Sequence, residues 1–280
     1  MSQTIGHVYS GGEQQQVADR FRDLGGNAIL YSYPNGDYDI ICAAERLFLP
    51  PGWESAEDFS RQGRNGPAPA KREKGKKSEG DDQIRSMRRA RSKLRRLALS
   101  NKLDYFVTLT LDKEKIDRYD PKAIMQKVNR WLDNMVRRHG LRYILVPERH
   151  KDGAIHFHGF FAGPGLQVVE SGVRHSEHMI YNLPQWGFGF TAAMELYGEY
   201  SSAVGYVCKY IGKQEGERPM GRWYYSGGDL KDPPKEYALI EYRDLMDQFP
   251  GEAVEIEIPG TKMIVVHHRE NQPKVDEKGG

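Results

Sequence analysis

Two histidines and one glutamate in the middle of the chain have the side chains and the spacing of a metal site. His156 and His158 are separated by one residue, so on a β-strand both imidazoles point to the same face. If residues 151–153 form a three-residue turn with Gly153 in the left-handed conformation, Glu148 lies directly opposite His156. Directly paired side chains have Cβ atoms roughly 4.5–5.5 Å apart, so the carboxylate and the two imidazoles would converge on one ion. A two-residue turn would instead send Glu148 to the other face, so the prediction specifies a register.

A second group of reactive side chains follows on a helix expected over residues 199–213. Tyr206 and Tyr210 are four residues apart and share one face of that helix. Lys209 and Lys213 each follow a tyrosine by three residues, and the pattern does not decide which lysine acts. A phenol with a pKa near 10 becomes a useful nucleophile when a nearby cation favours the phenolate. Two tyrosines at this spacing are also typical of an amphipathic core helix, but the upstream histidine pair favours chemistry.

A divalent metal at the first group would complement such a nucleophile. It would leave positions open for phosphate oxygens and act as a Lewis acid. The mixed nitrogen and oxygen ligands favour Mn²⁺ or Mg²⁺, although Zn²⁺ or Ni²⁺ would also bind. The expected product is a covalent phosphotyrosine, which stores the energy of the phosphodiester bond for later rejoining.

Positive charge is concentrated in one segment. The chain has a net charge of +2, but residues 61–100 contain 14 Lys or Arg and only 4 Asp or Glu. Such a segment predicts a polyanionic partner, most simply single-stranded or origin DNA. From residue 81 the pattern is helical, and a solvated basic face is the alternative interpretation. The side chains expected to grip DNA phosphates are Arg85, Arg88, Arg89, Arg91, Lys93, Arg95 and Arg96.

The order of elements around the two groups predicts the fold. Residues 105–111 have the β-branched and aromatic content of a strand. Asp120 and Pro121 are typical of a helix start, and this helix should end at Gly140. The two strands of the histidine hairpin follow. Strand–helix–strand–strand begins a ferredoxin-like or RNA-recognition-like α+β fold, with a central antiparallel sheet and flanking helices.

The remaining segments suggest a domain plan. Residues 163–195 read as a long surface excursion around a short strand, residues 222–226 as a core strand rather than a base-stacking surface, and residues 235–247 as helical. Strands are expected at 27–33, 38–43, 253–258 and 262–266. The predicted division is 1–60 as a small β appendage, 61–80 as a flexible basic linker, 81–266 as the catalytic domain and 267–280 as a polar tail.

The other histidines are not expected in the site. His175 and His178 read as ordinary surface residues, and His267 and His268 lack a nearby carboxylate in the sequence pattern. No stretch reaches the ~18 apolar residues of a membrane span, and the N-terminus has no secretory signal pattern. Only two cysteines occur, which suits a reducing cytoplasm.

Three stretches together resemble the motifs of a known superfamily. The segments 106–111 (FVTLTL), 155–158 (IHFH) and 206–210 (YVCKY) look like motifs I, II and III of the HUH endonucleases. More narrowly, residues 81–230 resemble rolling-circle replication initiators of phages and plasmids, in the group that includes the filamentous-phage gene II protein.

This resemblance implies a metal-dependent, site-specific DNA-nicking and DNA-joining enzyme that initiates, and by rejoining terminates, rolling-circle replication. His156, His158 and Glu148 would be ligands, and Tyr206 and Tyr210 the candidate nucleophiles, with Tyr206 slightly ahead. Nicking would leave a 5′-phosphotyrosine and a 3′-hydroxyl that primes synthesis. The expected setting is the cytoplasm of a bacterial host, with a host polymerase. A host helicase is expected because the chain has no phosphate-binding loop of the usual helicase pattern.

Rival interpretations differ in testable ways. A histidine-triad hydrolase needs a third alternating histidine, but position 160 is Phe. A transposase or relaxase of the same catalytic class is closer, although larger relaxases carry three histidines and a tyrosine near the N-terminus. A non-catalytic single-strand-binding module would need no metal triad. The origin sequence, the oligomeric state and the phage, plasmid or transposon source do not follow from the sequence.

Overall fold

The computed structural model describes residues 26–44, 48, 79–196, 200–213, 218–258 and 261–269. The chain divides into a first unit, Met1–Glu73 with Pro233–Gly280, and a second unit, Lys74–Asp232. Each unit contains an antiparallel sheet, which confirms the predicted α+β class with a ferredoxin-like sheet and flanking helices. None of the helices in the described ranges has the length and apolar character needed to cross a membrane.

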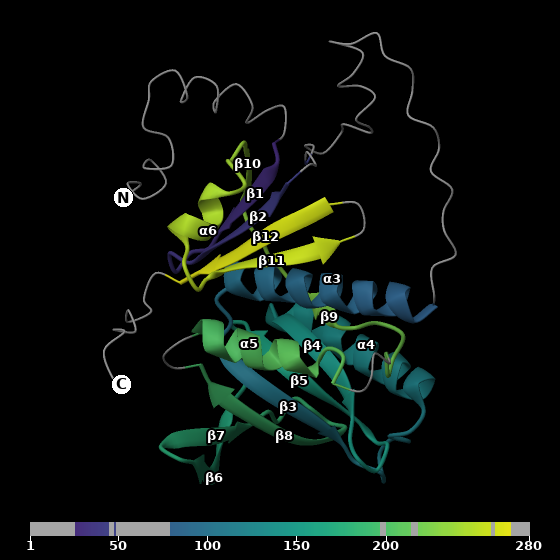
Figure 1. Ribbon diagram of the computed structural model, residues 1–280. Coiled ribbons are helices and arrows are strands. Elements are labelled where there is room, and N and C mark those ends of the chain that lie inside the picture. The colour runs from purple at the N-terminus through teal and green to yellow at the C-terminus, as the bar shows by residue number, and fades with distance from the viewer. Residues whose placement is uncertain are drawn as a thin grey trace, which may run out of the picture. The chain divides into compact units, whose positions relative to one another are not determined.

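The second unit is built on a seven-stranded sheet with the order β6-β7-β8-β3-β5-β4-β9 (Figure 1). Its strands are β3 (Tyr105–Leu111), β4 (Arg142–Arg149), β5 (Ile155–Ala162), β6 (Val169–His175), β7 (His178–Asn182), β8 (Gly189–Glu195) and β9 (Tyr225–Gly227). Its helices are α3 (Glu79–Ser100), α4 (Pro121–His139) and α5 (Tyr200–Tyr210).

The two faces of this sheet have different tasks. Alternate residues such as Leu109 and Phe157 are buried in one core with Ile124 and Leu132 of α4. The other face carries the polar residues of β3, β4 and β5, and there α5 contacts β4 and β5 while α3 packs against α5 (Figure 1). Because side chains alternate along a strand, one face builds the core and the other presents reactive groups to α5.

Local signals fix α4 as the sequence predicts. The Asp120 side chain accepts hydrogen bonds from the backbone N–H groups of Lys122 and Ala123, and Pro121 occupies the first turn. The helix ends at Gly140, whose φ of 63° is the left-handed conformation that glycine tolerates best.

The first unit contains a five-stranded sheet with the order β10-β1-β2-β12-β11. Its elements are β1 (Ala28–Ser32), β2 (Tyr38–Ala43), β10 (Lys235–Ala238), α6 (Asp244–Gln248), β11 (Ala253–Ile258) and β12 (Thr261–His268). One face buries residues of β1, β2 and β12 together with Leu245 of α6.

Three sequence-based assignments need correction. Residues 163–195 contain three strands rather than a surface excursion, and the seven-residue β8 pairs with β3 over its whole length. Residues 235–247 begin with β10, which pairs with β1, and only α6 is helical. In both cases pairing with a distant strand overrides weak local propensity. Tyr225, by contrast, lies in β9 and is buried as a core residue, as predicted.

The observed division also differs from the expected one. Strands β10, β11 and β12 complete the sheet begun by β1 and β2, so residues 233–268 belong with the N-terminal strands rather than with the catalytic domain. The tail was expected from 267, but β12 continues through His268. The predicted linker up to residue 78 and the tail from residue 270 lie outside the described residues.

Candidate metal centre and tyrosine helix

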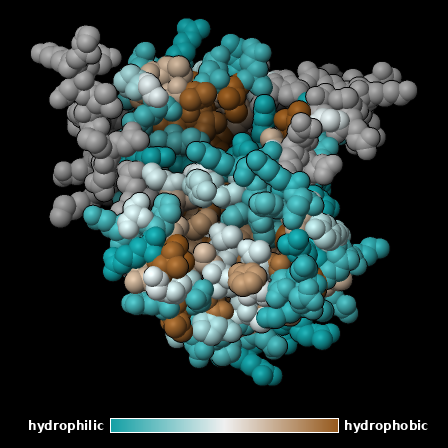
Figure 2. All heavy atoms as spheres, turned by 90° about the horizontal axis from the view of Figure 1, so that it is seen from below, coloured by the Kyte–Doolittle hydropathy of each residue, from teal (hydrophilic) through white to brown (hydrophobic). Residues whose placement is uncertain are grey.

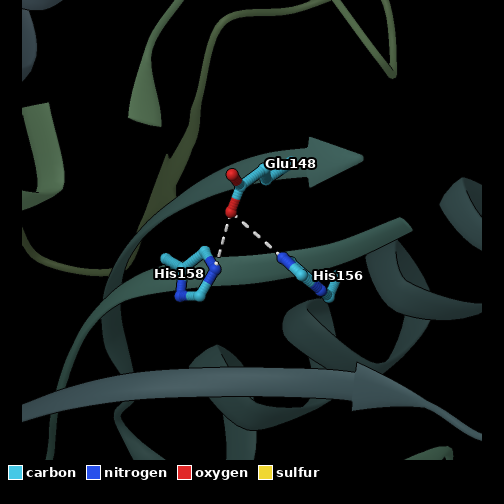
Figure 3. Close-up of side chains that lie close together, drawn as sticks. All are labelled: Glu148, His156 and His158. Carbon is cyan, nitrogen blue, oxygen red and sulfur yellow. Dashed lines mark hydrogen bonds and ion pairs between the residues drawn. The ribbon is translucent and has the colours of Figure 1, made fainter. Parts of the chain in front are cut away.

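The β4–β5 hairpin has the predicted register. The backbone N–H of His150 donates to Ala154 O at 2.8 Å, which leaves a three-residue turn, and Gly153 has φ 85°. Glu148 is therefore paired directly with His156. The carboxylate and the two imidazoles point toward one another from adjacent strands (Figure 3).

The three side chains form a compact donor set. Glu148 Oε2 lies 3.1 Å from His156 Nε2 and 3.0 Å from His158 Nε2, and the possible ligand atoms of all three lie within 4.8 Å of one another. Ligands about 2.1 Å from one ion and at right angles to each other are about 3.0 Å apart. The observed spacing and the nitrogen and oxygen chemistry of the donors therefore fit a divalent metal; the metal's identity is not fixed by them.

Electrostatics keeps the donors in the protonation states that ligands need. Burial would raise the pKa of the Glu148 carboxyl, but hydrogen bonds from Lys213 and His156 outweigh burial and hold the pKa below its usual value. Burial and the neighbouring His156 lower the pKa of His158 to about 4. At neutral pH, His158 is therefore a neutral imidazole with a free lone pair.

Thr108 on β3 orients one of these ligands. Its Oγ1 lies 3.1 Å from His158 Nδ1, so an Nδ1–H can donate to the hydroxyl and leave Nε2 facing Glu148. The sequence analysis did not single out Thr108. Its alternation with the core residues of β3 placed it on the polar face, but only the observed pairing of Thr108 with His158 reveals its role.

Helix α5 presents both tyrosines to the donor set. The ring of Tyr210 stacks on His158, with centroids 4.0 Å apart and planes inclined by 12°. The Tyr210 hydroxyl donates a hydrogen bond to the Tyr206 hydroxyl at 2.7 Å. Tyr206 is 50% exposed and its ring packs edge-on against Phe106. The two phenols are thus linked, one against a ligand and the other open to solvent.

The two phenols also differ in electrostatic setting. Burial, the hydrogen bond to Tyr206 and the nearby charge of Glu148 all raise the pKa of Tyr210. Tyr210 is therefore held in its neutral form, in which it can donate a proton to the hydrogen bond. Tyr206, as the acceptor, is the phenol whose developing negative charge that bond would stabilise.

The structure separates the two lysines. Lys213 Nζ lies 2.7 Å from Glu148 Oε1 and 5.1 Å from the centre of the Tyr210 ring. Lys209 is exposed, and among the described residues it makes no hydrogen bond or ion pair. Lys213 is therefore the lysine that the fold brings to the donor set.

The basic side chains of α3 fall into two classes. Arg88, Arg89 and Lys93 are exposed. Arg91 instead donates from Nε to Cys208 O at 3.1 Å and from an Nη to Ile211 O at 2.6 Å. These carbonyls end α5, where unpaired acceptors and the helix dipole favour a cation. Arg85, Arg95 and Arg96 are only partly exposed.

We expect Arg91→Met to lower the free energy of unfolding by about 2 kcal/mol, because two charge-assisted hydrogen bonds to α5 are lost. Arg89→Met, on the same helix but exposed, should change it by less than about 0.5 kcal/mol. Urea denaturation of both variants measures the difference. Equal stabilities would contradict a positioning role for Arg91.

The remaining histidines are partly as predicted. His175 and His178 are exposed, and they pair across the β6–β7 turn. The reason for setting aside His267 and His268 was wrong, because each has a carboxylate partner. His267 Nδ1 lies 2.8 Å from Asp39 and His268 Nδ1 lies 2.8 Å from Glu252. All four residues belong to the first unit, whereas the donor set belongs to the second.

Comparison with known proteins gives one match. Residues 104–215 match the model of the family described as replication-associated protein ORF2/gene II protein. Neither the curated proteins nor the solved structures contain a match to the chain. The matched range includes the donor set and both tyrosines but not α3 or the first unit. It supports a replication-associated protein of the Rep or gene II kind, which interacts with DNA.

Proposed function

We propose that the second unit is a metal-dependent nuclease and strand transferase of the HUH type, which nicks one DNA strand at a replication origin. The observation that carries this proposal is the contact between the tyrosine pair and the donor set, in which Tyr210 stacks on His158 and bonds to Tyr206. The family match supports the replication context. A divalent ion held by Glu148, His156 and His158 would supply Lewis-acid stabilisation of charge on the scissile phosphate.

The protein residues then have distinct tasks. The Tyr206 oxygen loses its proton and forms a bond to phosphorus, while the bond between phosphorus and the 3′ oxygen breaks. The 3′ oxygen takes up a proton, so the products are a 5′-phosphotyrosine and a 3′-hydroxyl. Attack of a 3′-hydroxyl on the phosphotyrosine reverses the step and rejoins DNA. Tyr210 donates to Tyr206, and Lys213 holds the Glu148 carboxylate in place.

The test is formation of a covalent protein–DNA band on a denaturing gel, with labelled single-stranded DNA from the candidate origin and Mn²⁺. We expect a band that requires metal and disappears in the Tyr206→Phe, Tyr210→Phe double variant. Tight binding to the origin strand without any band would instead favour a non-catalytic binding module. A host helicase and a host polymerase would act after the nick.

Helix α3 is proposed as the surface that grips phosphates, through its exposed Arg88, Arg89 and Lys93 only. Replacing all three with Met should weaken binding to single-stranded DNA and reduce the slope of log K against log salt by about 2. Arg91→Met is the matched control, because it removes one positive charge from the same helix without removing an exposed one. An unchanged slope in the triple variant would contradict this role. Deletion of the whole segment is less informative, since Leu94 and Leu97 of α3 are buried.

A further inference from the structure

Phe190 on β8 is exposed in a stretch whose other aromatic residues are buried. It is 73% exposed, more than any other large hydrophobic side chain in the described residues. Trp186 in the same stretch is buried, and Phe188 packs against the same core. Burying a phenylalanine gains about 1.5–3 kcal/mol, which the fold forgoes at this position. Single exposed apolar residues are common, so the position of Phe190 must carry the argument.

Phe190 belongs to the same row of side chains as two of the candidate ligands. Strand pairing links Glu148 with His156, His156 with Thr110, and Thr110 with Phe190. Directly paired residues in an antiparallel sheet point to the same face. Strands β5 and β8 flank β3, so His156 and Phe190 are about 10 Å apart along this row. Stacked nucleotides rise about 3.4 Å each, so a strand covers that distance in roughly three nucleotides.

The backbone beneath Phe190 is held firmly. The N–H of Asp112 donates to Phe188 O at 2.8 Å, and the Trp186 indole donates to Thr110 O at 3.3 Å. A Cβ at Gly189 would collide with Thr110 O, so only glycine permits this close approach of the two strands. Phe190 is thus presented on a fixed strand.

We propose that Phe190 is a stacking platform for one base of the single strand whose phosphate occupies the candidate metal centre. This inference rests on the proposed function, because it assumes a single-stranded DNA substrate. A lone ring suits a base, which offers a flat π-face of similar size, whereas a protein partner needs a contiguous apolar patch. In the lower half of Figure 2, hydrophobic side chains stand in small groups among hydrophilic ones.

The test measures affinity for a labelled single-stranded origin oligonucleotide without metal, so that cleavage does not contribute. Phe190→Leu keeps an apolar side chain but removes the ring, and we expect binding about tenfold weaker. Phe190→Trp should bind at least as well as the wild type. Val173→Ala is the control, because Val173 is also exposed, at 56%, on β6. Binding to the duplex form of the same oligonucleotide should be equal in all four proteins, because its bases are already stacked.

A scan with single abasic sites then locates the base. One abasic position should weaken wild-type binding but have little further effect on Phe190→Leu. Equal affinities of wild type and Phe190→Leu would overturn the platform, whether or not the protein nicks DNA. Loss of binding in Phe190→Leu, with no covalent adduct under any condition, would support the platform and overturn the nuclease. No binding of single-stranded DNA by the wild type would overturn both.

Discussion

Replacing His156 with alanine is expected to lower the rate of covalent adduct formation by about a thousandfold or more. The substitution removes one of three donors that converge within 4.8 Å, and with it the charge stabilisation that a bound metal gives to phosphate oxygens. His156 is also bonded to Glu148 at 3.1 Å, so the carboxylate loses a partner that fixes its orientation. Single-turnover assays with origin DNA over a range of Mn²⁺ concentrations measure this loss.

The same variant should lose a property that does not depend on activity. A ligand present at a hundred times its dissociation constant stabilises the folded state by about 2.7 kcal/mol. For a unit of this size, that raises the melting temperature by roughly 5–10 °C. We expect Mn²⁺ to stabilise the wild type and not His156→Ala. His175→Ala, an exposed histidine on β6, is the matched control and should respond to metal as the wild type does. Metal-induced stabilisation that persists in His156→Ala would place the metal elsewhere.

The site was more predictable than its surroundings because short-range rules govern it. The Gly153 turn and the alternation of β5 are sufficient to pair Glu148 with His156. Helical spacing is sufficient to bring Tyr206 and Tyr210 to one face. These relations span fewer than ten residues, so local geometry determines them.

Features that depend on distant contacts were not accessible in the same way. Arg89 and Arg91 are equivalent in the sequence of α3, and only the position of α5 makes one exposed and the other a partner of Ile211. Lys209 and Lys213 are equivalent in the pattern as well, but the turn after α5 brings only Lys213 to Glu148. Strands β8 and β10 were missed for the same reason, because each is defined by the strand with which it pairs.

The hydrogen bond between the tyrosines predicts unequal roles for them. Tyr206→Phe should reduce adduct formation by about 10⁴-fold or more, as expected for loss of a nucleophile. Tyr210→Phe should still form the adduct, about 10- to 100-fold more slowly, because it loses a hydrogen bond of about 1.5–3 kcal/mol to the developing phenolate. Adduct rates and mass spectrometry of the DNA-linked peptide measure both effects. Tyr119→Phe is the matched control, since Tyr119 is also 50% exposed.

The alternative to unequal roles is two interchangeable nucleophiles, and the single variants distinguish the two cases. If either phenol attacks equally well, each single variant keeps most of the adduct and only the double variant loses it. The structure favours asymmetry because Tyr210 is held against His158 by stacking and donates its proton to Tyr206, whereas the Tyr206 hydroxyl accepts that bond at an exposed position. An adduct mapped to Tyr210 in the wild type would reverse this assignment. It would require α5 to rotate or shift before attack, since the Tyr210 hydroxyl would first have to leave Tyr206.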